Sequence, residues 1–368
     1  MSEYYIGVMS GTSLDGIDIA YCQIKEHSFE LLQSDSYSFD KEIREDVLKA
    51  IKTPLTLKQI GELDTRLGEM YAGAIERFIS QKRIDKKQIT AIGLHGQTLW
   101  HEPNSTHPFS MQLGNPNVIT ALTGVSVVSD FRRKDMALGG QGAPFAPAFH
   151  QYLFSRLKAK IAVVNIGGMA NLSILGERLI GYDTGCGNVL MDHWISLNKK
   201  ETYDKDGEWA RSGTFDRDLL EQMLKEPYFS KAIPKSTGRE LFNADWLERE
   251  LRKFSPKKSG ALSIKKEDVQ ATLLELSAMS ISNEVKKSGV DMLIVCGGGV
   301  KNSYLMQRLG DRLTGVEVVS SDECGVSSEF MEAMAFAWLA HERVHRKCVK
   351  LSSVTGASKD SILGAIYE

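Results

Sequence analysis

A turn near the start of the chain gathers the residue types that phosphate oxygens require. Ser10, Gly11, Thr12 and Ser13 separate two apolar runs, and Asp15-Gly16 completes the turn. Glycine lets backbone amides approach a ligand closely, and the Ser and Thr hydroxyls add hydrogen-bond donors. The sequence G-x-x-x-x-G-K-[ST] occurs nowhere, so this turn is no Walker A loop. Because hydroxyl residues and glycine are also common in plain hairpins, both interpretations stay open.

A second turn places a carboxylate at the end of a strand-like run. Asp183 is followed by Gly185 and Gly187, and a helical pattern begins near Asn188. A carboxylate beside glycines at a helix N-terminus is well placed to act as a base next to a bound phosphate. Asp-Thr-Gly is also the triplet of aspartic proteases, but those enzymes need two such aspartates and this chain has one. A plain turn aspartate remains the alternative.

A third turn holds three consecutive glycines between a buried strand and a helix. Gly297, Gly298 and Gly299 follow an apolar run, and Asn302 or Ser303 is expected to cap the helix. Such a flat platform suits the close approach of a nucleotide, although a tight structural turn would use the same residues. The pattern G-x-G-x-x-G is absent, because Asn302 occupies its last position, so NAD binding is disfavoured.

Polar residues also follow two further predicted strands. His95 and Gln97 end one of them, where ligands usually bind in α/β proteins, although a lone histidine is more often structural. Arg132 and Arg133 follow the other, and one of them is a candidate for holding an anionic substrate group. Placement on the surface is the competing interpretation for both arginines.

These turns must be positioned by alternating strands and helices. The helix predicted over 327–344 is apolar nearly all round and should be buried. Strand-like runs lie at 4–8, 17–24, 91–96, 125–130, 161–168, 173–183, 292–299 and 316–322, and longer helical patterns at 55–80, 268–285 and 327–344. The alternation predicts an α/β protein with sheets covered by helices.

The length of 368 residues predicts two lobes, because one core rarely grows so large. The loop-rich stretch 130–150 is the expected seam, and the polar segment 199–260 is expected to elaborate the second lobe. Residues 6–19 can be laid over 162–175, with Gly11 on Gly167, which suggests that each lobe begins with a similar hairpin.

Composition excludes several classes of protein. A net charge of −2 provides no excess of positive charge that would favour binding to nucleic acid or to an anionic membrane surface. The five cysteines are scattered without a C-x-x-C pair, which argues against disulfides and a zinc site. Without a signal-peptide pattern or a long apolar run, the sequence predicts a cytoplasmic protein.

The order of the motifs along the chain indicates a particular protein family. GVMSGTSLDGID, HGQT, DFRRKDMALGGQGAPFAPAFH, NIGGMANLS, DTGCGN, CGGGVKN and EAMAFAWLA resemble the 1,6-anhydro-N-acetylmuramic acid kinases of the actin, sugar-kinase and Hsp70 superfamily. The resemblance implies a two-lobed actin-like (ribonuclease H-like) ATPase fold, with duplicated mixed sheets flanked by helices around a central cleft. Lobe I would span residues 1–135 and lobe II residues 136–368, with C-terminal residues packing back on lobe I.

The resemblance also implies a reaction of peptidoglycan recycling. ATP, with Mg²⁺, would phosphorylate O6 of 1,6-anhydro-N-acetylmuramic acid while water opens the anhydro ring, giving N-acetylmuramic acid 6-phosphate and ADP. An ordinary sugar kinase and a non-catalytic ATP-binding sensor are the alternatives. Members of this family are often dimers, so a homodimer is implied, although nothing in the sequence points to a dimer surface.

The resemblance also implies roles for individual residues of this sequence. Asp183 would activate the water, and Asp15 or Asp18 would hold Mg²⁺ through water. Where the family often has proline between the glycines of the Asp-Thr-Gly turn, this chain has Cys186, which predicts a less rigid turn. ATP and its phosphates would contact Ser10, Gly11, Thr12, Ser13, Asp15, Gly16, Asp18, Gly167, Gly168, Gly185, Gly187, Gly297, Gly298, Gly299 and Asn302. The sugar would contact His95, Gln97, Arg132 and Glu332.

Overall fold

The computed structural model describes residues 2–11, 14, 16–26, 28–254 and 264–368. The chain forms two compact units, one of Met1–Leu153 with Phe330–Glu368 and one of Phe154–Glu329. Residues 136–153, which the sequence assigned to lobe II, lie in the first unit. The reason is aromatic packing by helix α5 (Ala146–Phe154): the Phe149 and Tyr152 rings lie 5.6 and 5.5 Å from the Trp338 ring.

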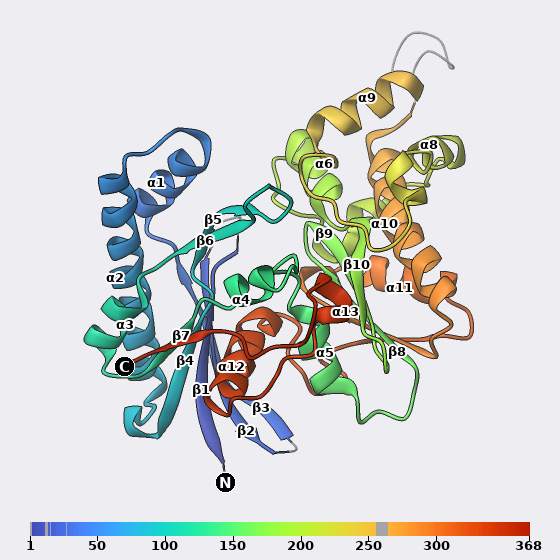
Figure 1. Cartoon of the computed structure of the whole chain (residues 1–368). Coiled ribbons are helices and arrows are strands. Elements are labelled where there is room, and N and C mark those ends of the chain that lie inside the picture. The colour runs from blue at the N-terminus through green and yellow to red at the C-terminus, as the bar shows by residue number, and fades with distance from the viewer. Residues whose placement is uncertain (1, 12–13, 15, 27, 255–263) are drawn as a thin grey trace. The chain divides into compact units, whose positions relative to one another are not determined.

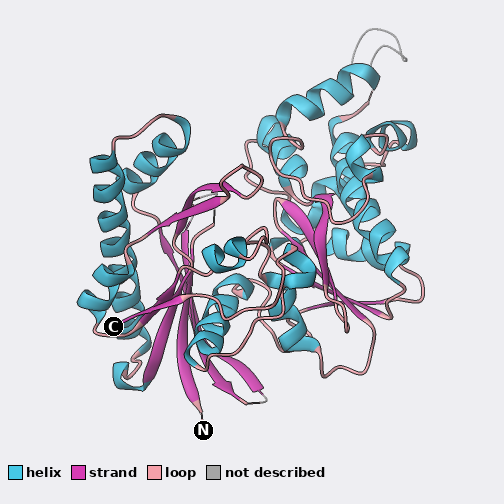
Figure 2. Cartoon of the chain, viewed as in Figure 1, coloured by secondary structure: helices cyan, strands magenta, loops and turns pink. Residues whose placement is uncertain are grey.

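The first unit is built on a six-stranded sheet (Figures 1 and 2). Its order is β13-β7-β4-β1-β2-β3, in which β1, β2 and β3 form an antiparallel meander and β4 and β7 run parallel to β1. The strands are β1 (Glu3–Met9), β2 (Gly16–Lys25), β3 (Ser28–Ser38), β4 (Ile89–Leu94), β7 (Val127–Ser129) and β13 (Ala365–Tyr367). A hairpin of β5 (Gln97–Glu102) and β6 (Phe109–Leu113) stands apart from this sheet.

Helices cover both faces of this sheet. Ile6 and Val8 pack in one core with Leu67 of α2 (Leu57–Lys82). Gly7, which points to the other face because side chains alternate along a strand, lies against the backbone of α12 (Met331–Val344). As predicted, α12 is buried along most of its length. The remaining helices are α1 (Lys41–Lys52), η1 (Lys86–Gln88), α3 (Pro116–Thr123), α4 (Arg132–Ala137) and α13 (Ser352–Thr355).

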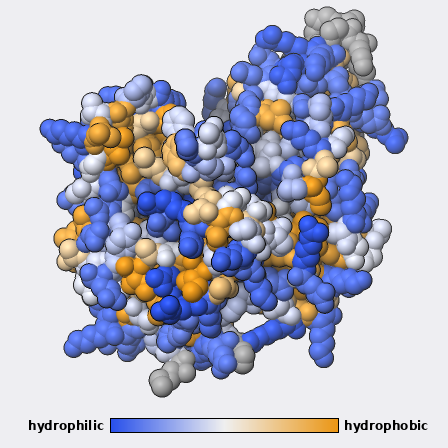
Figure 3. Space-filling model, in the orientation of Figure 1, coloured by the Kyte–Doolittle hydropathy of each residue, from blue (hydrophilic) through white to orange (hydrophobic). Residues whose placement is uncertain are grey.

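Hydrophilic side chains cover most of the face seen in Figure 3, but apolar ones gather over α1 and the β5–β6 hairpin. They line a cavity of about 500 Å³, and Trp100 and Phe109 at its edge are 50% and 43% exposed.

The second unit contains a five-stranded sheet of order β10-β9-β8-β11-β12. Its strands are β8 (Ile161–Ile166), β9 (Met169–Ile174), β10 (Ile180–Cys186), β11 (Met292–Cys296) and β12 (Glu317–Ser320). The single strand predicted over 173–183 is wrong, because Gly176, Glu177 and Arg178 turn the chain between β9 and β10. β8, β9 and β10 are antiparallel, whereas β11 runs parallel to β8 and to β12.

The helices of this unit include the predicted long helix, α10 (Lys266–Ser288), which is buried over most of its length. The described part of the predicted segment 199–260, residues 199–254, belongs to this unit, as predicted, and supplies short helices. The others are α6 (Val189–Lys199), η2 (Lys205–Gly207), α7 (Glu208–Ser212), α8 (Arg217–Met223), η3 (Pro227–Ser230), α9 (Ala244–Phe254), η5 (Gly298–Lys301) and α11 (Ser303–Arg312). Across the described ranges of both units, no helix combines the length and apolar character that a membrane span requires.

The two sheets repeat one topology. The order β3-β2-β1-β4-β7 in the first unit matches β10-β9-β8-β11-β12 in the second, with the same strand directions throughout. The hairpin β1–β2 therefore corresponds to β8–β9, which confirms the internal similarity predicted between residues 6–19 and 162–175. The fold is a duplicated α/β structure, and each copy presents a glycine-containing turn after its first strand.

Candidate active site

Asp183 lies on β10, where the strand departs from regular pairing. Asp183 pairs with Asn171 and Gly185 with Ala170, so Thr184 is an extra residue in the ladder. Such a bulge bends the strand and re-aims its side chains. The Thr184 hydroxyl donates to the carbonyl of Ala170 at 3.3 Å, which fixes the bulge beside the candidate base.

The loop after η3 holds the Asp183 carboxylate in place. Its Oδ2 accepts hydrogen bonds from the backbone amide of Thr237 at 2.9 Å and from the hydroxyl of Ser236 at 3.1 Å. The backbone is held as well, since the Asp183 amide donates to Lys235 O at 3.1 Å and the Tyr228 hydroxyl donates to Asp183 O at 2.7 Å. One carboxylate oxygen is thus fixed by two donors from one loop.

The surroundings of Asp183 strengthen it as a base. Burial raises the pKa of this half-buried carboxyl group above its usual range, and the charge of Glu240 acts in the same direction. The hydrogen bonds from Thr237 and Ser236 oppose the shift but do not cancel it. A carboxylate with a raised pKa accepts a proton more readily than an exposed one, and the two donors keep it oriented.

A buried ion pair anchors this loop. Lys235 Nζ lies 3.0 Å from Glu284 Oε1 of α10, and both side chains are almost fully buried. Glu284 also accepts from Lys287 at 3.0 Å and from the Tyr182 hydroxyl at 3.2 Å. Moving the loop away from α10 would separate this pair and leave a buried charge without its partner, which is costly. The ion pair therefore fixes the position of the loop on α10.

The second glycine turn joins directly to the Asp-Thr-Gly turn. Gly187 N donates to Gly168 O at 2.8 Å, and Asn188 N donates to Gly167 O at 2.8 Å. A Cβ at Gly187 would collide with the Gly167 carbonyl, whereas one at Gly168 would meet Val189 Cβ at 3.8 Å, an ordinary contact. The glycine at 187 therefore permits the contact between the turns, whereas position 168 has room for a Cβ. Close packing also surrounds Gly185, where a Cβ would lie 2.7 Å from the Phe229 ring.

The triple-glycine turn packs on the end of β8. Gly297 has φ of 79°, a left-handed conformation that favours glycine, and a Cβ there would collide with Asn165. A Cβ on Gly299 would lie 2.5 Å from the Ile166 side chain. Asn302 caps α11, as predicted, by accepting a hydrogen bond from Leu305 N at 2.9 Å.

A cavity of about 290 Å³ opens beside Gly298 and Asn302. Burial raises the pKa of Asp192 to about 7; Arg239 opposes this shift and the negative charge of Asp204 adds to it. The cavity is lined by Asn188, Met191, Asp192, Tyr203, Asp204, Gly298, Lys301 and Asn302. Most of these residues were missed from the sequence. Asn188 and Asp192 lie four residues apart at the start of a helix, a spacing that places them on one face and offered a signal.

In the first unit, Ser10 joins two other polar residues at the end of β1. Its Oγ lies 2.6 Å from the Tyr71 hydroxyl and donates to Gln97 Oε1 at 2.9 Å. Gly11 O accepts from Leu14 N at 3.2 Å, and Gly16 begins β2. Thr12, Ser13 and Asp15 lie outside the described residues. The structure thus brings the candidates Ser10 and Gln97 together.

His95 and Arg132 form a second pair. Arg132 Nε and Nη2 lie 3.2 and 2.8 Å from His95 Nε2, and Nη1 donates to Gly142 O at 2.8 Å. Burial and then the Arg132 charge lower the pKa of His95 to about 3, so this imidazole is neutral and Nε2 accepts. Burial lowers the pKa of Arg132 to about 10, which leaves it charged near neutral pH. The arginine therefore retains N–H groups for an anion. Arg133 instead pairs with Asp130 at 2.8 Å on the surface.

Two carboxylates come near this pair. Glu332 lies in the first turn of α12. Desolvation by the surrounding protein raises the pKa of its carboxyl group, the charge of Asp18 adds to this shift, and the charge of Arg132 opposes it. The Glu332 side chain nevertheless remains open to solvent. Asp18 on β2 accepts a hydrogen bond from the Ser36 hydroxyl at 2.6 Å. The first unit thus gathers acidic and basic side chains near the ends of its first strands.

The duplicated sheets, each with a glycine turn after its first strand, define the actin-like ATPase fold that sugar kinases share. A family model described as anhydro-N-acetylmuramic acid kinase matches residues 3–368, so the chain belongs to the anhydro-N-acetylmuramic acid kinase family. It is a phosphotransferase that acts on a small sugar and uses ATP.

Two curated relatives carry the same description as the family model. The anhydro-N-acetylmuramic acid kinase of Sulfurimonas denitrificans is 64% identical over 368 residues, with 100% of both chains covered. That of a Sulfurovum species is 51% identical over 365 residues and 99% of each chain. Among solved structures, the activator of the 2-hydroxyisocaproyl-CoA dehydratase from Clostridium difficile, with bound ADPNP, has a TM-score of 0.47 and 11% identity, covering 93% of this chain and 96% of that one.

Proposed function

We propose that Asp183 is the base of a reaction that opens and phosphorylates 1,6-anhydro-N-acetylmuramic acid. The single observation that carries the assignment is the fixed, half-buried carboxylate of Asp183 with its raised pKa. Asp183 removes a proton from water as the water oxygen bonds to the anomeric carbon. The bond from that carbon to the bridging oxygen breaks, and this oxygen, now O6, takes the γ-phosphoryl group as its bond to ADP breaks.

The ATP assignment rests on the glycine turns. Phosphoryl transfer requires mainly positioning and neutralisation of charge, which backbone amides supply. The turns Ser10–Gly16 and Gly167–Gly168 would bind phosphate oxygens, and Gly187 supports the second turn. Gly297–Gly299 and Asn302 would receive the adenosine at the 290 Å³ cavity, with Asn188, Asp192 and Tyr203 among its walls.

The sugar assignment rests on the polar cluster of the first unit. Neutral His95 positions the Arg132 guanidinium, whose remaining N–H groups suit the lactyl carboxylate of the substrate. Gln97 and Glu332 offer an amide and a carboxylate for sugar hydroxyls or the N-acetyl group. These roles are proposals for residues that the structure brings into one region of the unit.

Magnesium fits the same region. Asp18 supplies the oxygen ligand type that Mg²⁺ prefers, and its charge is among the causes that raise the pKa of Glu332. When bound, Mg²⁺ would neutralise the phosphate charge, with Asp18 holding it through water. Asp15, the other candidate, lies outside the described residues.

The cytoplasmic location and the homodimer also stay predictions. Light scattering would measure the oligomeric state.

Asp183→Asn tests the base directly. We expect turnover of 1,6-anhydro-N-acetylmuramic acid to fall about a thousandfold or more, with ATP affinity unchanged, because a general base contributes roughly 10²–10⁴ in rate. Asp192→Asn is the matched control on the neighbouring helix, and it should raise KM for ATP while leaving kcat nearly intact. Comparable turnover by Asp183→Asn and the wild type would contradict the role of Asp183.

The reaction type has its own test. In ¹⁸O-labelled water the product should carry one heavy oxygen at the anomeric carbon and a phosphate on O6. An ordinary sugar kinase would leave the anomeric position unlabelled, and a sensor module would form no product. Neither alternative is favoured by the family match.

A further inference from the structure

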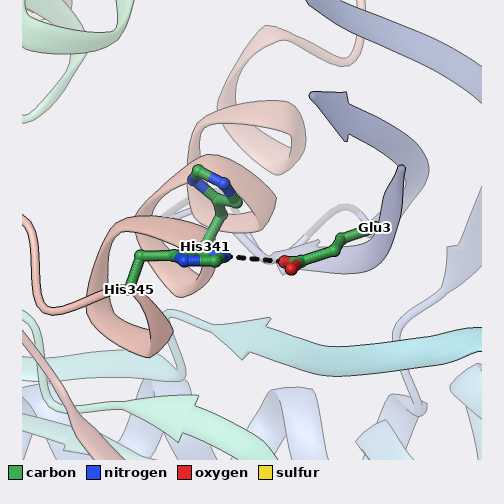
Figure 4. A group of neighbouring side chains, drawn as sticks. All are labelled: Glu3, His341 and His345. Carbon is green, nitrogen blue, oxygen red and sulfur yellow. Dashed lines mark hydrogen bonds and ion pairs between the residues drawn. The ribbon is translucent and has the colours of Figure 1, made fainter. Parts of the chain in front are cut away.

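Three potential metal ligands meet at the end of the first unit where β1 begins and α12 ends. Glu3 comes from β1, and His341 and His345 come from α12 and the residue after it (Figure 4). Each offers one ligand atom, and these atoms all lie within 4.8 Å of one another. Glu3 Oε2 and His345 Nε2 are 2.7 Å apart. The segments joined here are separated by more than 300 residues of sequence.

Helical spacing explains why the two histidines meet. Residues four apart lie on the same side of a helix, and the His341 and His345 ring centroids are 4.5 Å apart. Two imidazoles and one carboxylate are a donor set typical of Zn²⁺ and related ions, whereas Mg²⁺ prefers oxygen alone. Small side-chain rotations would bring the three atoms to coordination distance from one ion.

Neighbouring groups already orient two of the ligands. The buried imidazole of His341 has Nδ1 2.9 Å from Glu342 Oε1, so Nδ1 carries the proton and Nε2 is left to bind an ion. The Tyr5 hydroxyl donates to Glu3 Oε2 at 2.6 Å, and its ring packs edge-on against His341 at 5.4 Å. Hydrogen bonds of this kind to metal-binding histidines and carboxylates fix their orientation and raise their affinity.

We propose that Glu3, His341 and His345 bind a divalent transition-metal ion such as Zn²⁺, with water completing its coordination. The ion would join the first strand of the unit to the end of its long buried helix. Its role is structural, because a metal held by two segments so distant in sequence stabilises the folded state over the unfolded chain.

The order His-Glu-x-x-His, residues 341–345, is also that of zinc peptidases. There the glutamate faces a metal-bound water and acts as the base. Here Glu342 is 8% exposed and accepts a hydrogen bond from His341 Nδ1, so it supports a ligand and does not face a substrate. The structure therefore favours a structural ion over a peptidase centre.

The site is also remote from the proposed phosphoryl transfer. Glu332 lies in the first turn of α12 and His345 just beyond its last turn, which places them about 20 Å apart along the axis. Kinase turnover with Mg²⁺ should not depend on the ion, so failure of the proposed reaction and failure of the metal site are distinguishable.

Binding can be measured on the full chain without a histidine tag, after a chelator has been removed by dialysis. We expect about one equivalent of Co²⁺ to bind with visible d–d absorption, and Zn²⁺ to compete for it and raise the melting temperature. His345→Ala and Glu3→Gln should weaken binding at least tenfold and abolish the Zn²⁺-dependent rise. His107→Ala, which removes an exposed histidine outside the cluster, is the control that should bind as the wild type does.

Kinase turnover serves as the check of folding for each variant, and His345→Gln, which can still donate to Glu3, replaces His345→Ala if that variant fails it. The proposal is overturned if the wild type shows no saturable binding. It is equally overturned if His345 and Glu3 variants bind as tightly as His107→Ala, because the ion would then occupy another site.

Discussion

The proposed role of Asp183 as the base predicts that its hydrogen bonds tune how the activity depends on pH. A base works only when it is deprotonated, so turnover should fall as the pH drops through the pKa of Asp183, which burial has raised. Ser236→Ala removes a donor that lowers this pKa, so the acid limb of the pH–rate profile should move to higher pH. Turnover at acid pH should fall about two- to tenfold, since the lost bond is made to a charged group but is partly exposed.

Thr237→Ala is the control for that change. The bond from Thr237 comes from its backbone amide, which alanine retains, so the acid limb should stay where the wild type has it. An unchanged limb in Ser236→Ala, measured as kcat against pH, would show that the hydroxyl does not tune Asp183.

The residue scale also shows what sequence reasoning can find. Asp183 and the glycines were nominated from the sequence because the turn chemistry is local. Ser236 and Thr237, more than fifty residues away, carry no such pattern, and they meet Asp183 only through the fold. Likewise, the sequence nominated Arg132 for an anion but gave no sign that His95 would take two of its contacts.

At the scale of elements, the contact between α12 and the first sheet depends on two glycines. A Cβ at Gly7 would collide with Ala333 O, and one at Gly93 with Phe336 O, so the helix backbone lies directly on β1 and β4. Gly7→Ala should destabilise the first unit by about 3 kcal/mol, because neither backbone can yield without moving the whole helix. The melting temperature should fall by roughly 2–4 °C for each kcal/mol.

Gly73→Ala provides the comparison. Gly73 lies on the exposed side of α2 with nothing within 4 Å of a Cβ, so alanine there should stabilise the protein by up to about 1 kcal/mol. Calorimetry on both variants measures the difference, and equal melting temperatures would contradict the close packing of α12.

Elements with a strong pattern were predicted and half-exposed ones were not. The apolar helix α12 and the amphipathic α2 follow directly from their periodicity. β3, with its run of polar and partly exposed residues, and the β5–β6 hairpin carry little alternation, so no strand was predicted over 28–38. These edges are held by pairing to a neighbouring strand, which the sequence of the segment alone does not encode.

At the scale of the whole molecule, the two units differ in how the chain builds them. The second is one continuous segment with its own sheet and core, whereas the first needs both Met1–Leu153 and Phe330–Glu368. A fragment of residues 154–329 should therefore unfold cooperatively when heated alone. A fragment of residues 1–153 should not, because its sheet lacks α12. Thermal unfolding of both fragments, followed by circular dichroism, tests this prediction. A cooperative transition in the fragment of residues 1–153 would contradict the assigned units.

That discontinuity sets an order of events on the ribosome. The strands β1 to β7 emerge first, but the helix that covers one face of their sheet is made only after the whole second unit. At about 5–20 residues per second, an incomplete sheet waits on the order of ten seconds or more with apolar surface open to other nascent chains. The continuous unit can finish folding in that interval, so the part synthesised first becomes native last, and the cell's chaperones would meet this protein mainly through its N-terminal half.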